Sequence, residues 1–245
     1  MVTYFSGSPT KDGHDMDGDF RMTNSYASPM LETPEAAQAY VGAAELRRIA
    51  TDPFKRAFDI LAAGLLLIFF APLLLLWAAL IKLESPGPAL FRQTRGGLNG
   101  RTFTIYKLRS MRCEENGAKV VQAKRGDDRI TRTGRIIRMT SIDELPQLLN
   151  VLKGDMSIIG PRPHAQAHDV QYGALIADYH LRFQARPGLT GLAQIKGLRG
   201  ETGTVDDMAA RIAADVDYIE NWSLWSDIRI ILLTVPHLLM AKNAY

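Results

Sequence analysis

Cysteine is almost absent from the 245-residue chain, which contains a single one, Cys113. One thiol excludes an internal disulfide framework and fits a reducing compartment. The sequence also lacks a G-K-[ST] triplet, so the glycines at 96, 97 and 100 match no phosphate-binding loop and are expected in a turn. No apolar run precedes residue 57, and we therefore expect no secretory signal.

Charge is missing from the 22 residues between Ile60 and Ile81, which are almost entirely apolar. At about 1.5 Å per residue, a helix of this length matches the roughly 30 Å of a bilayer core. Pro72 favours a kink near its middle. Cationic residues, Lys55 and Arg56 before the run and Lys82 after it, prefer the cytoplasm. We expect a re-entrant helix broken at Pro72 with both ends on the cytoplasmic face; a kinked spanning helix is the alternative.

The start of the chain is rich in Gly, Ser, Asp and Pro and has no apolar periodicity, which predicts a disordered tail. Its Asp15-Met-Asp17 spacing resembles the metal motif of some glycosyltransferases but is too common to carry an assignment. A second such pair, Asp215 and Asp217, falls on an amphipathic pattern and is expected on the solvated surface. The predicted units are a tail (1–50), a membrane-embedded helix (51–84) and a cytosolic catalytic domain (85–245).

The sequence after residue 85 predicts an α+β fold rich in helices. Residues 89–93 and 101–106 read as two short strands joined by a glycine-rich turn, a small β-hairpin. Apolar residues at helical spacing over residues 206–221 predict an amphipathic helix. The uncharged run 230–241 is too short to span a bilayer, and we expect it to lie along the membrane surface.

Basic residues concentrate in one part of the chain. Residues 92–138 hold thirteen Lys and Arg against four Asp and Glu, whereas residues 1–50 hold four against seven. Such an excess predicts an anionic partner, for example a phosphate group, a nucleotide or a lipid surface. Nucleic-acid binding would require exposed aromatics between the basic residues, but Phe103 and Tyr106 fall in the strand pattern. We therefore expect no nucleic-acid partner.

Asp143 and Glu144 are adjacent carboxylates at the start of an apolar helical pattern. Ser141 followed by Glu144 fits a capping box, which is the structural interpretation. Pro146 instead favours a helix that begins at Asp143, which would place both carboxylates at its positive end. Anions and their metal ions gather at such an end, so catalysis is the second interpretation. The pair alone does not decide between the two.

Cationic clusters bracket this pair along the sequence: Lys107 with Arg109, Arg135 with Arg138, Arg162 between two prolines, and the loop from Arg186 to Gly191. Arginine forks recognise phosphate oxygens in pairs. Fixed arginines around two carboxylates suit phosphoryl chemistry, in which one carboxylate attacks phosphorus and the other holds a Mg²⁺. His164 and His168 have metal-ligand spacing but no glutamate partner motif, so we expect no metal there.

Several long motifs follow one another along the chain: Lys55-Arg56-x-x-Asp59, FRQTRGGLNGRTFTIYKLRSM, RMTSIDELPQLLNVLKGDMSIIGPRP, RPGLTGLAQIKG and YIENWSLWSDI. On these motifs, residues 54 to about 235 closely resemble the bacterial sugar transferase family, the monotopic phosphoglycosyl transferases. The resemblance implies transfer of a hexose-1-phosphate from a UDP-sugar to undecaprenyl phosphate, with release of UMP. It also implies the bacterial inner membrane, with the catalytic domain on its cytoplasmic face, and the first membrane step of exopolysaccharide or other surface glycan synthesis.

The resemblance assigns roles to the matched residues. Asp143 is the nucleophile of a ping-pong reaction through a covalent phosphosugar, and we expect it to be ionised at neutral pH. Glu144 binds the Mg²⁺ cofactor. The residues assigned to substrate phosphate or nucleotide are Lys107, Arg109, Arg138 and Arg162, and in a loop near the nucleotide Arg186, Gly188, Thr190 and Gly191.

Two positions depart from the family pattern. Ala71 precedes Pro72 where the family often has serine, so no hydroxyl is available to a carbonyl freed by the proline. Leu192 stands where many members carry tryptophan, which bears on sugar or nucleotide preference. The sugars expected by resemblance are glucose and galactose, and the further partners are downstream glycosyltransferases and a second copy of the chain. The alternatives are a membrane-associated glycosyltransferase that releases UDP and a catalytically idle scaffold.

Overall fold

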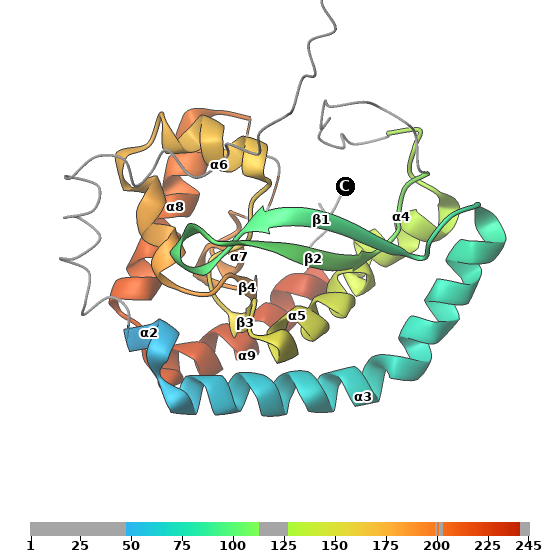
Figure 1. Ribbon diagram of the computed structural model, residues 1–245, viewed down its shortest axis with the longest axis horizontal. Helices are drawn as coiled ribbons and strands as arrows, with labels where there is room; N and C mark the ends of the chain where they lie inside the picture. Colours follow the sequence, from blue (N-terminus) through green and yellow to red (C-terminus); the bar gives the residue numbers. More distant parts are fainter. Residues whose placement is uncertain (1–47, 113–126, 199, 201–202, 241–245) are drawn as a thin grey trace, which may run out of the picture.

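The structure is a computed structural model that describes residues 48–112, 127–198, 200 and 203–240. Residues 1–47 of the predicted tail, with Asp15 and Asp17, lie outside the described residues, as does Cys113. The described part is an α+β fold rich in helices, as predicted, with one long apolar helix and two two-stranded sheets (Figure 1).

Helix α3 (Pro53–Glu84) contains the whole uncharged run and follows the short helix α2 (Arg48–Thr51). Asp52 caps its N-terminus by accepting a hydrogen bond of 2.9 Å from the N–H three residues on, and Pro53 occupies the first helical position, where no N–H is needed. The helix continues through Pro72, and Figure 1 shows it changing direction in its second half. A proline inside a helix removes one hydrogen bond and favours such a bend.

Most apolar side chains of α3 point away from the body. Phe69 is 74% exposed and Leu65 is similarly exposed, although burying such a side chain would stabilise the protein by roughly 1.5–3 kcal/mol. Among the described residues, α3 is the one helix long and apolar enough to cross a membrane. The buried residues of this helix are Lys55, Asp59, Ala63 and Ile81. A helix that exposes so many large apolar side chains indicates membrane association.

Strands β1 (Leu90–Gly96) and β2 (Thr102–Leu108) form the predicted hairpin and pair antiparallel along their whole length. The connection contains the 3₁₀ turn η2 (Leu98–Gly100), where Asn99 and Gly100 adopt positive φ angles of 55° and 71°. Left-handed residues of this kind are typical of tight hairpin connections. The hairpin packs on the segment that carries the two adjacent carboxylates.

The remaining elements follow in order: α4 (Arg132–Met139), η3 (Ile142–Gln147), α5 (Leu148–Lys153), β3 (Ser157–Ile159), α6 (Gln166–Gly173), η4 (Ala177–Gln184), β4 (Gly188–Thr190), α7 (Leu192–Ile195), α8 (Val205–Glu220) and α9 (Leu224–Met240). The main core lies between the hairpin, α5, β3 and the two last helices, and it includes Ile105, Val151, Ile159, Tyr218 and Ile230. This core holds elements that are distant in the sequence around one centre.

Strands β3 and β4 pair in parallel at a place where two stretches of backbone nearly touch. A Cβ atom on Gly188 would lie 2.1 Å from the Gly160 nitrogen, and one on Gly191 would lie 2.3 Å from the Gly160 oxygen. Packing therefore requires glycine at positions 188 and 191, both predicted to bind substrate. This contact holds the chain immediately before Arg162 against β4, while a ligand-binding role of the two glycines stays a prediction.

Helix α8 confirms the predicted amphipathic helix over residues 206–221. The prediction that Asp215 is solvated is wrong, because its side chain is buried and its carboxylate lies 3.2 Å from the Arg182 guanidinium. Asp217 does lie near the surface, where it pairs with Lys196 at 3.1 Å. The helical pattern identified the helix but not which of the two carboxylates faces the interior.

The uncharged run 230–241 belongs, as far as residue 240, to α9, which begins six residues earlier at Leu224. Trp225 is 74% exposed and Leu232 is also exposed. Figure 1 places α9 on the same side of the body as the first half of α3. Its position along the membrane surface stays a prediction.

Candidate functional site

The adjacent carboxylates lie on η3, a six-residue 3₁₀ helix that leads directly into α5. Ser141 has a left-handed backbone (φ 56°), and its side chain does not cap the helix; its carbonyl accepts a hydrogen bond from the Glu144 N–H (3.1 Å). The Glu144 side chain turns away towards two cations. The capping box expected from the sequence is therefore absent, and the regular α-helix begins at Leu148 instead of Asp143.

Glu144 is buried and shares its carboxylate between two basic side chains. Lys107, near the end of β2, places its Nζ 2.9 Å from Oε1. Arg162, after β3, donates from Nη2 to Oε1 (2.6 Å) and from Nη1 to Oε2 (3.2 Å). A bidentate arginine fork is among the strongest of charge-assisted contacts and fixes the orientation of both groups. Three segments far apart in the sequence thus meet at one carboxylate.

Asp143 is half-buried beside this cluster. Burial, and next the negative charge of Glu144, raise the pKa of Asp143 to about 6, and the cations Lys107, Arg138 and Arg162 oppose that rise. A helix N-terminus, where the sequence placed Asp143, would act in the opposite direction and lower this pKa. Desolvation and a like charge outweigh that effect here. A pKa of about 6 is compatible with an ionised carboxylate at neutral pH, which stays a prediction.

Arg95 belongs to the same charged cluster, although the sequence indicated it only as one of the basic residues between 92 and 138. Burial, and next the charge of Arg162, lower the pKa of Arg95 to about 10, while Asp169 and Glu144 act in the opposite sense. Burial likewise lowers the pKa of Lys107. The register of the hairpin could have identified Arg95. Residues 91, 93 and 95 pair with 107, 105 and 103, which puts Arg95 and Lys107 on one face.

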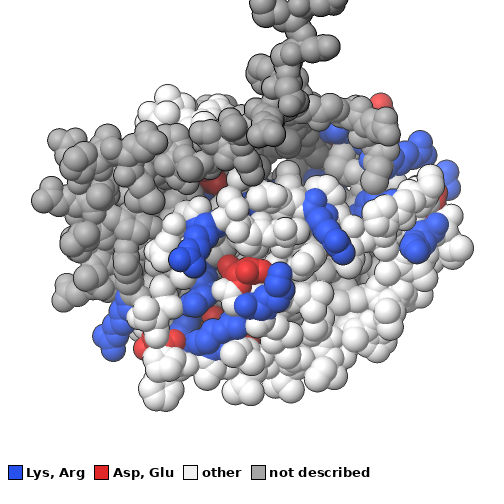
Figure 2. All heavy atoms as spheres, in the orientation of Figure 1, with Lys and Arg blue, Asp and Glu red and all other residues white. Residues whose placement is uncertain are grey.

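On the face shown in Figure 2, basic side chains predominate over acidic ones around the hairpin. This agrees with the basic excess of residues 92–138, of which residues 113–126 lie outside the described part. The surface therefore presents positive charge close to the carboxylate pair. Such a surface attracts an anionic ligand.

Two of the predicted phosphate-binding arginines are bound to backbone elsewhere in the structure. Arg109 is buried, and its guanidinium donates to the carbonyls of Pro86 (2.6 Å) and Ser85 (2.7 Å) at the end of α3. Arg186 donates to the carbonyls of Ala50 (2.6 Å) and Gly154 (3.0 Å). These contacts give both residues a structural role. Their part in substrate binding stays a prediction, as does that of Thr190, whose hydroxyl lies 2.9 Å from the hydroxyl of Thr234.

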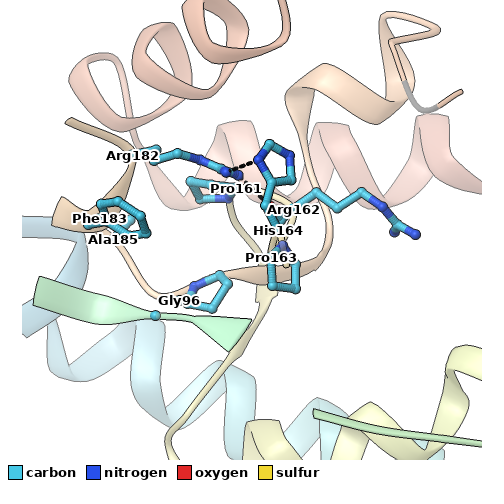
Figure 3. A pocket seen from close by; sticks show the side chains of 10 residues that line it. Gly96, Pro161, Arg162, Pro163, His164, Arg182, Phe183 and Ala185 are labelled. Atoms are coloured by element: carbon cyan, nitrogen blue, oxygen red, sulfur yellow. Dashed lines mark hydrogen bonds between the residues drawn. The ribbon is translucent and has the colours of Figure 1, made fainter. Parts of the chain in front are cut away.

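A small pocket lies next to Arg162, between the end of β1 and the residues that follow η4 (Figure 3). Arg182 lines it and donates to the backbone carbonyl of Arg162 and to Nδ1 of His164. The Arg162 side chain extends away from this pocket. Arg182 is in turn paired with Asp215, and His164 is buried beside Tyr179 (2.7 Å). His164 is thus part of a polar core.

The described residues contain no group of three or more His, Cys, Asp or Glu that could enclose a metal ion. Magnesium rarely needs such a group, because it binds one or two carboxylates and takes its other ligands from water and substrate phosphates. Asp143 and Glu144 offer hard oxygen atoms of this kind. Both Glu144 oxygens are bound to cations, so an ion would have to share or exchange those contacts. The residues fit Mg²⁺ only together with a phosphate ligand.

Comparison with known proteins supplies a family. Residues 50–241 match the family described as bacterial sugar transferase. The chain is 66% identical over 200 residues to the UDP-glucose:undecaprenyl-phosphate glucose-1-phosphate transferase of Caulobacter vibrioides, a match that covers 82% of this chain and 75% of that protein. It is 51% identical over 191 residues to the protein of the same name from Escherichia coli, covering 78% of this chain and 41% of the relative.

A third relative carries a different sugar in its name. The UDP-N-acetylgalactosamine-undecaprenyl-phosphate N-acetylgalactosaminephosphotransferase of Aeromonas hydrophila is 48% identical over 192 residues, which cover 78% of this chain and 44% of that protein. The chain thus spans less than half the length of two of these three relatives. The matched region contains every site residue described above.

The environment of Asp143 predicts its titration. We expect an apparent pKa of about 6 for this carboxyl group, measured from the ¹³C carboxyl shift of the aspartate-labelled protein and assigned by its loss in Asp143→Asn. Glu144→Gln removes the neighbouring negative charge, so the pKa should fall. Asp217→Asn, at the surface, should leave it unchanged. A wild-type pKa near 4, or a rise in Glu144→Gln, would contradict this account of the site.

Proposed function

Because the chain belongs to the bacterial sugar transferase family and is therefore a transferase, we propose that it moves glucose 1-phosphate from UDP-glucose to undecaprenyl phosphate and releases UMP. The observation that carries this proposal is the half-buried Asp143 beside a carboxylate held by Lys107 and Arg162. Glucose is favoured over galactose because two relatives, at 66% and 51% identity, carry UDP-glucose in their names. A glycosyltransferase that releases UDP is the alternative, and the nucleotide product separates the two.

In the first step, an Asp143 carboxylate oxygen attacks the phosphorus atom that bears the sugar. A bond forms between this oxygen and phosphorus, the bond from phosphorus to the bridging oxygen breaks, and UMP leaves. In the second step, an oxygen of the lipid phosphate attacks the same phosphorus atom, and the bond to Asp143 breaks. Nucleophilic catalysis of this kind divides one difficult transfer into two similar displacements.

The cationic residues suit the charge of this reaction. A carboxylate that approaches a diphosphate is repelled by it, and positive charge fixed at the site offsets the repulsion. Lys107 and Arg162 are oriented through Glu144, and Arg138 and Arg95 act on the same cluster. Lys107 and Arg162 are thereby held in place before the substrate arrives, which reduces the reorganisation needed during the reaction.

Mg²⁺ is the cofactor that we assign to this reaction. When bound, the ion would neutralise part of the diphosphate charge and favour departure of UMP. Glu144 would hold it, with the substrate phosphates completing its ligands. The ion would share the Glu144 carboxylate with Lys107 and Arg162, which keep their positions beside the phosphate groups.

The membrane arrangement that we propose is based on helix α3. We assign the chain to the bacterial inner membrane, with α3 re-entrant and the catalytic domain on the cytoplasmic face. The exposed apolar residues of α3 and the bend in its second half support this arrangement. The lipid product would feed downstream glycosyltransferases of exopolysaccharide or surface glycan synthesis.

The proposed intermediate can be isolated. Wild-type protein incubated with sugar-labelled UDP-glucose, without lipid acceptor, should retain label on Asp143 and release UMP. Asp143→Asn keeps the shape but loses the charge, so its turnover should fall by several orders of magnitude. Asp217→Asn is the matched surface control and should behave as wild type. Release of UDP, or normal turnover by Asp143→Asn without an adduct in intact-protein mass spectrometry, would refute the mechanism.

We expect the transfer reaction to depend on Mg²⁺. Chelation should abolish UMP release, and added Mg²⁺ should restore it. Glu144→Gln should lower the rate and raise the Mg²⁺ concentration needed for half-maximal activity, because it removes the proposed ligand. Full activity in excess chelator would exclude the ion from the reaction.

The topology of α3 is open to direct labelling. Single cysteines placed at Thr51 and at Leu83, in a Cys113→Ser background, should both be protected from an impermeant maleimide added to sealed spheroplasts. Both should react after permeabilisation. Labelling of either position alone from outside would indicate a spanning helix.

A further inference from the structure

Three charged side chains in the first two turns of α3, those of Lys55, Arg56 and Asp59, face the body, unlike most side chains of this helix. Lys55 is 3% exposed and Asp59 is 1% exposed, and Arg56 is half-buried. Burying a charged side chain costs several kcal/mol unless it is paired and hydrogen-bonded. A role of Lys55 and Arg56 as flanking charges at the membrane, as predicted from the sequence, does not account for their burial. Their contacts indicate a second role.

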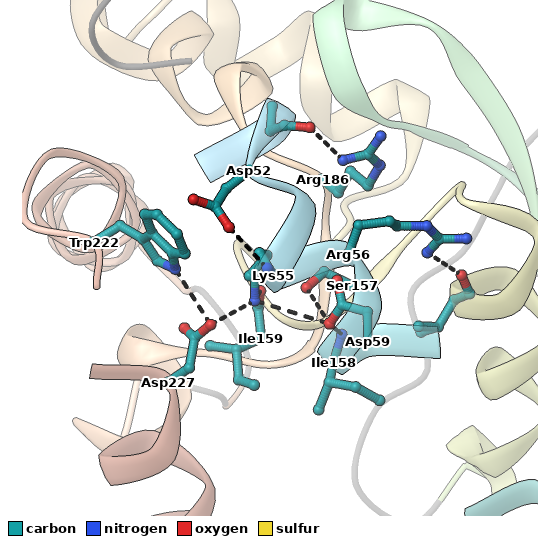
Figure 4. Close-up of polar contacts among 12 residues, drawn as sticks. Asp52, Lys55, Arg56, Asp59, Ser157, Ile158, Ile159, Arg186, Trp222 and Asp227 are labelled. Atoms are coloured by element: carbon teal, nitrogen blue, oxygen red, sulfur yellow. Dashed lines mark hydrogen bonds and ion pairs between the residues drawn. The ribbon is translucent and has the colours of Figure 1, made fainter. Parts of the chain in front are cut away.

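Lys55 and Asp59 hold strand β3 (Figure 4). The Lys55 ammonium group lies 2.8 Å from an Asp227 carboxylate oxygen and donates to the carbonyl of Ile159 (3.1 Å). Asp59 accepts hydrogen bonds from the N–H of Ile158 (3.0 Å) and the hydroxyl of Ser157 (2.9 Å). All three residues of β3 are therefore bonded to the base of α3.

Arg56 holds the end of α5 in the same way. Its guanidinium donates to the carbonyls of Val151 (2.6 Å) and Leu152 (2.9 Å). These carbonyls belong to the last turn of α5, where a helix leaves its acceptors without helical partners. Gly154 ends the helix with a φ of 90°, and a Cβ atom there would approach the Arg56 guanidinium to 3.5 Å.

The two segments held by α3 are those that carry the site. Helix α5 directly follows η3, with Asp143 and Glu144, and Arg162 stands three residues after Ile159. Between Ile159 and Arg162, the Gly160 N–H donates to the Thr190 carbonyl (2.9 Å). This hydrogen bond fixes the residue that directly follows β3. The fork between Arg162 and Glu144 therefore joins two segments that rest on one support.

We propose that Lys55 and Arg56 are positioning residues, which hold Arg162 and the Asp143–Glu144 pair in register from the base of the membrane helix. This inference rests on the proposed function for its kinetic test. It predicts that loss of either contact impairs the reaction through misplacement of the site, because a displacement of about 1 Å can cost about a hundredfold in rate.

The test is a double-mutant cycle on UMP release. Lys55→Met should lower kcat between about tenfold and a hundredfold, by more than it raises KM. If Lys55 acts through Arg162, adding Lys55→Met to Arg162→Ala should cause little further loss. Arg56→Gln, at a partly exposed position, should also lower kcat, and it serves where Lys55→Met fails to fold. Arg211→Lys is the control, since this buried arginine also donates to two carbonyls, those of Leu198 and Gly200.

The control variant Arg211→Lys should have a lower thermal stability than wild type but an unchanged kcat. Wild-type kcat in folded Lys55→Met and Arg56→Gln, or a Lys55→Met loss that multiplies fully with that of Arg162→Ala, would overturn the positioning role. Absence of UMP from the wild type would refute the proposed function alone. Hydrogen exchange measured without substrate then tests the positioning role. Lys55→Met should exchange faster than wild type in peptides covering 142–150 and 157–164. If Lys55→Met does not fold, Arg56→Gln takes its place in this measurement. Unchanged exchange in both peptides would overturn the proposal.

Discussion

The Glu144 carboxylate is the contact on which the arrangement of the site depends. Lys107 from the hairpin and Arg162 from the segment after β3 both bind it, so a single buried charge joins three parts of the chain. Leaving any of the three charges without a partner would be costly in this partly buried setting. The same pairing keeps two cations close to Asp143. Structural cohesion and preorganisation for catalysis therefore come from one interaction.

The state of Asp143 reflects a balance between opposed effects. Burial and the adjacent carboxylate raise its pKa to about 6, while three basic side chains limit the rise. A carboxylate that is less solvated than usual is a better nucleophile, provided that it remains ionised at the working pH. The cations that we propose to hold a diphosphate are also those that limit the rise of the Asp143 pKa. A purely structural helix start would require neither the burial nor the cations.

Helix α3 combines two chemically different parts. Its base carries buried charges that bind β3 and α5, whereas the following residues present apolar side chains to their surroundings. This combination joins the apolar segment to the elements that carry the proposed site. Helix α3 therefore supports the proposed site in addition to its role in membrane association.

The sequence alone was sufficient to predict the long apolar helix, the hairpin, the helix over 206–221 and, through its motifs, the family. Each of these depends on local periodicity or on an uninterrupted run of residues. It also singled out Asp143, Glu144, Lys107 and Arg162. Which cations lie near these carboxylates follows from tertiary packing. Arg95 joins the cluster, whereas Arg109 and Arg186 bind backbone carbonyls. Lys55 and Asp215 are buried. Contacts between residues far apart in the sequence, such as Lys55 and Asp227, depend on how the elements pack, and no local pattern encodes them. The direction of the Asp143 pKa shift also could not be predicted from a local pattern, because the carboxyl group is desolvated only once the surrounding chain has folded.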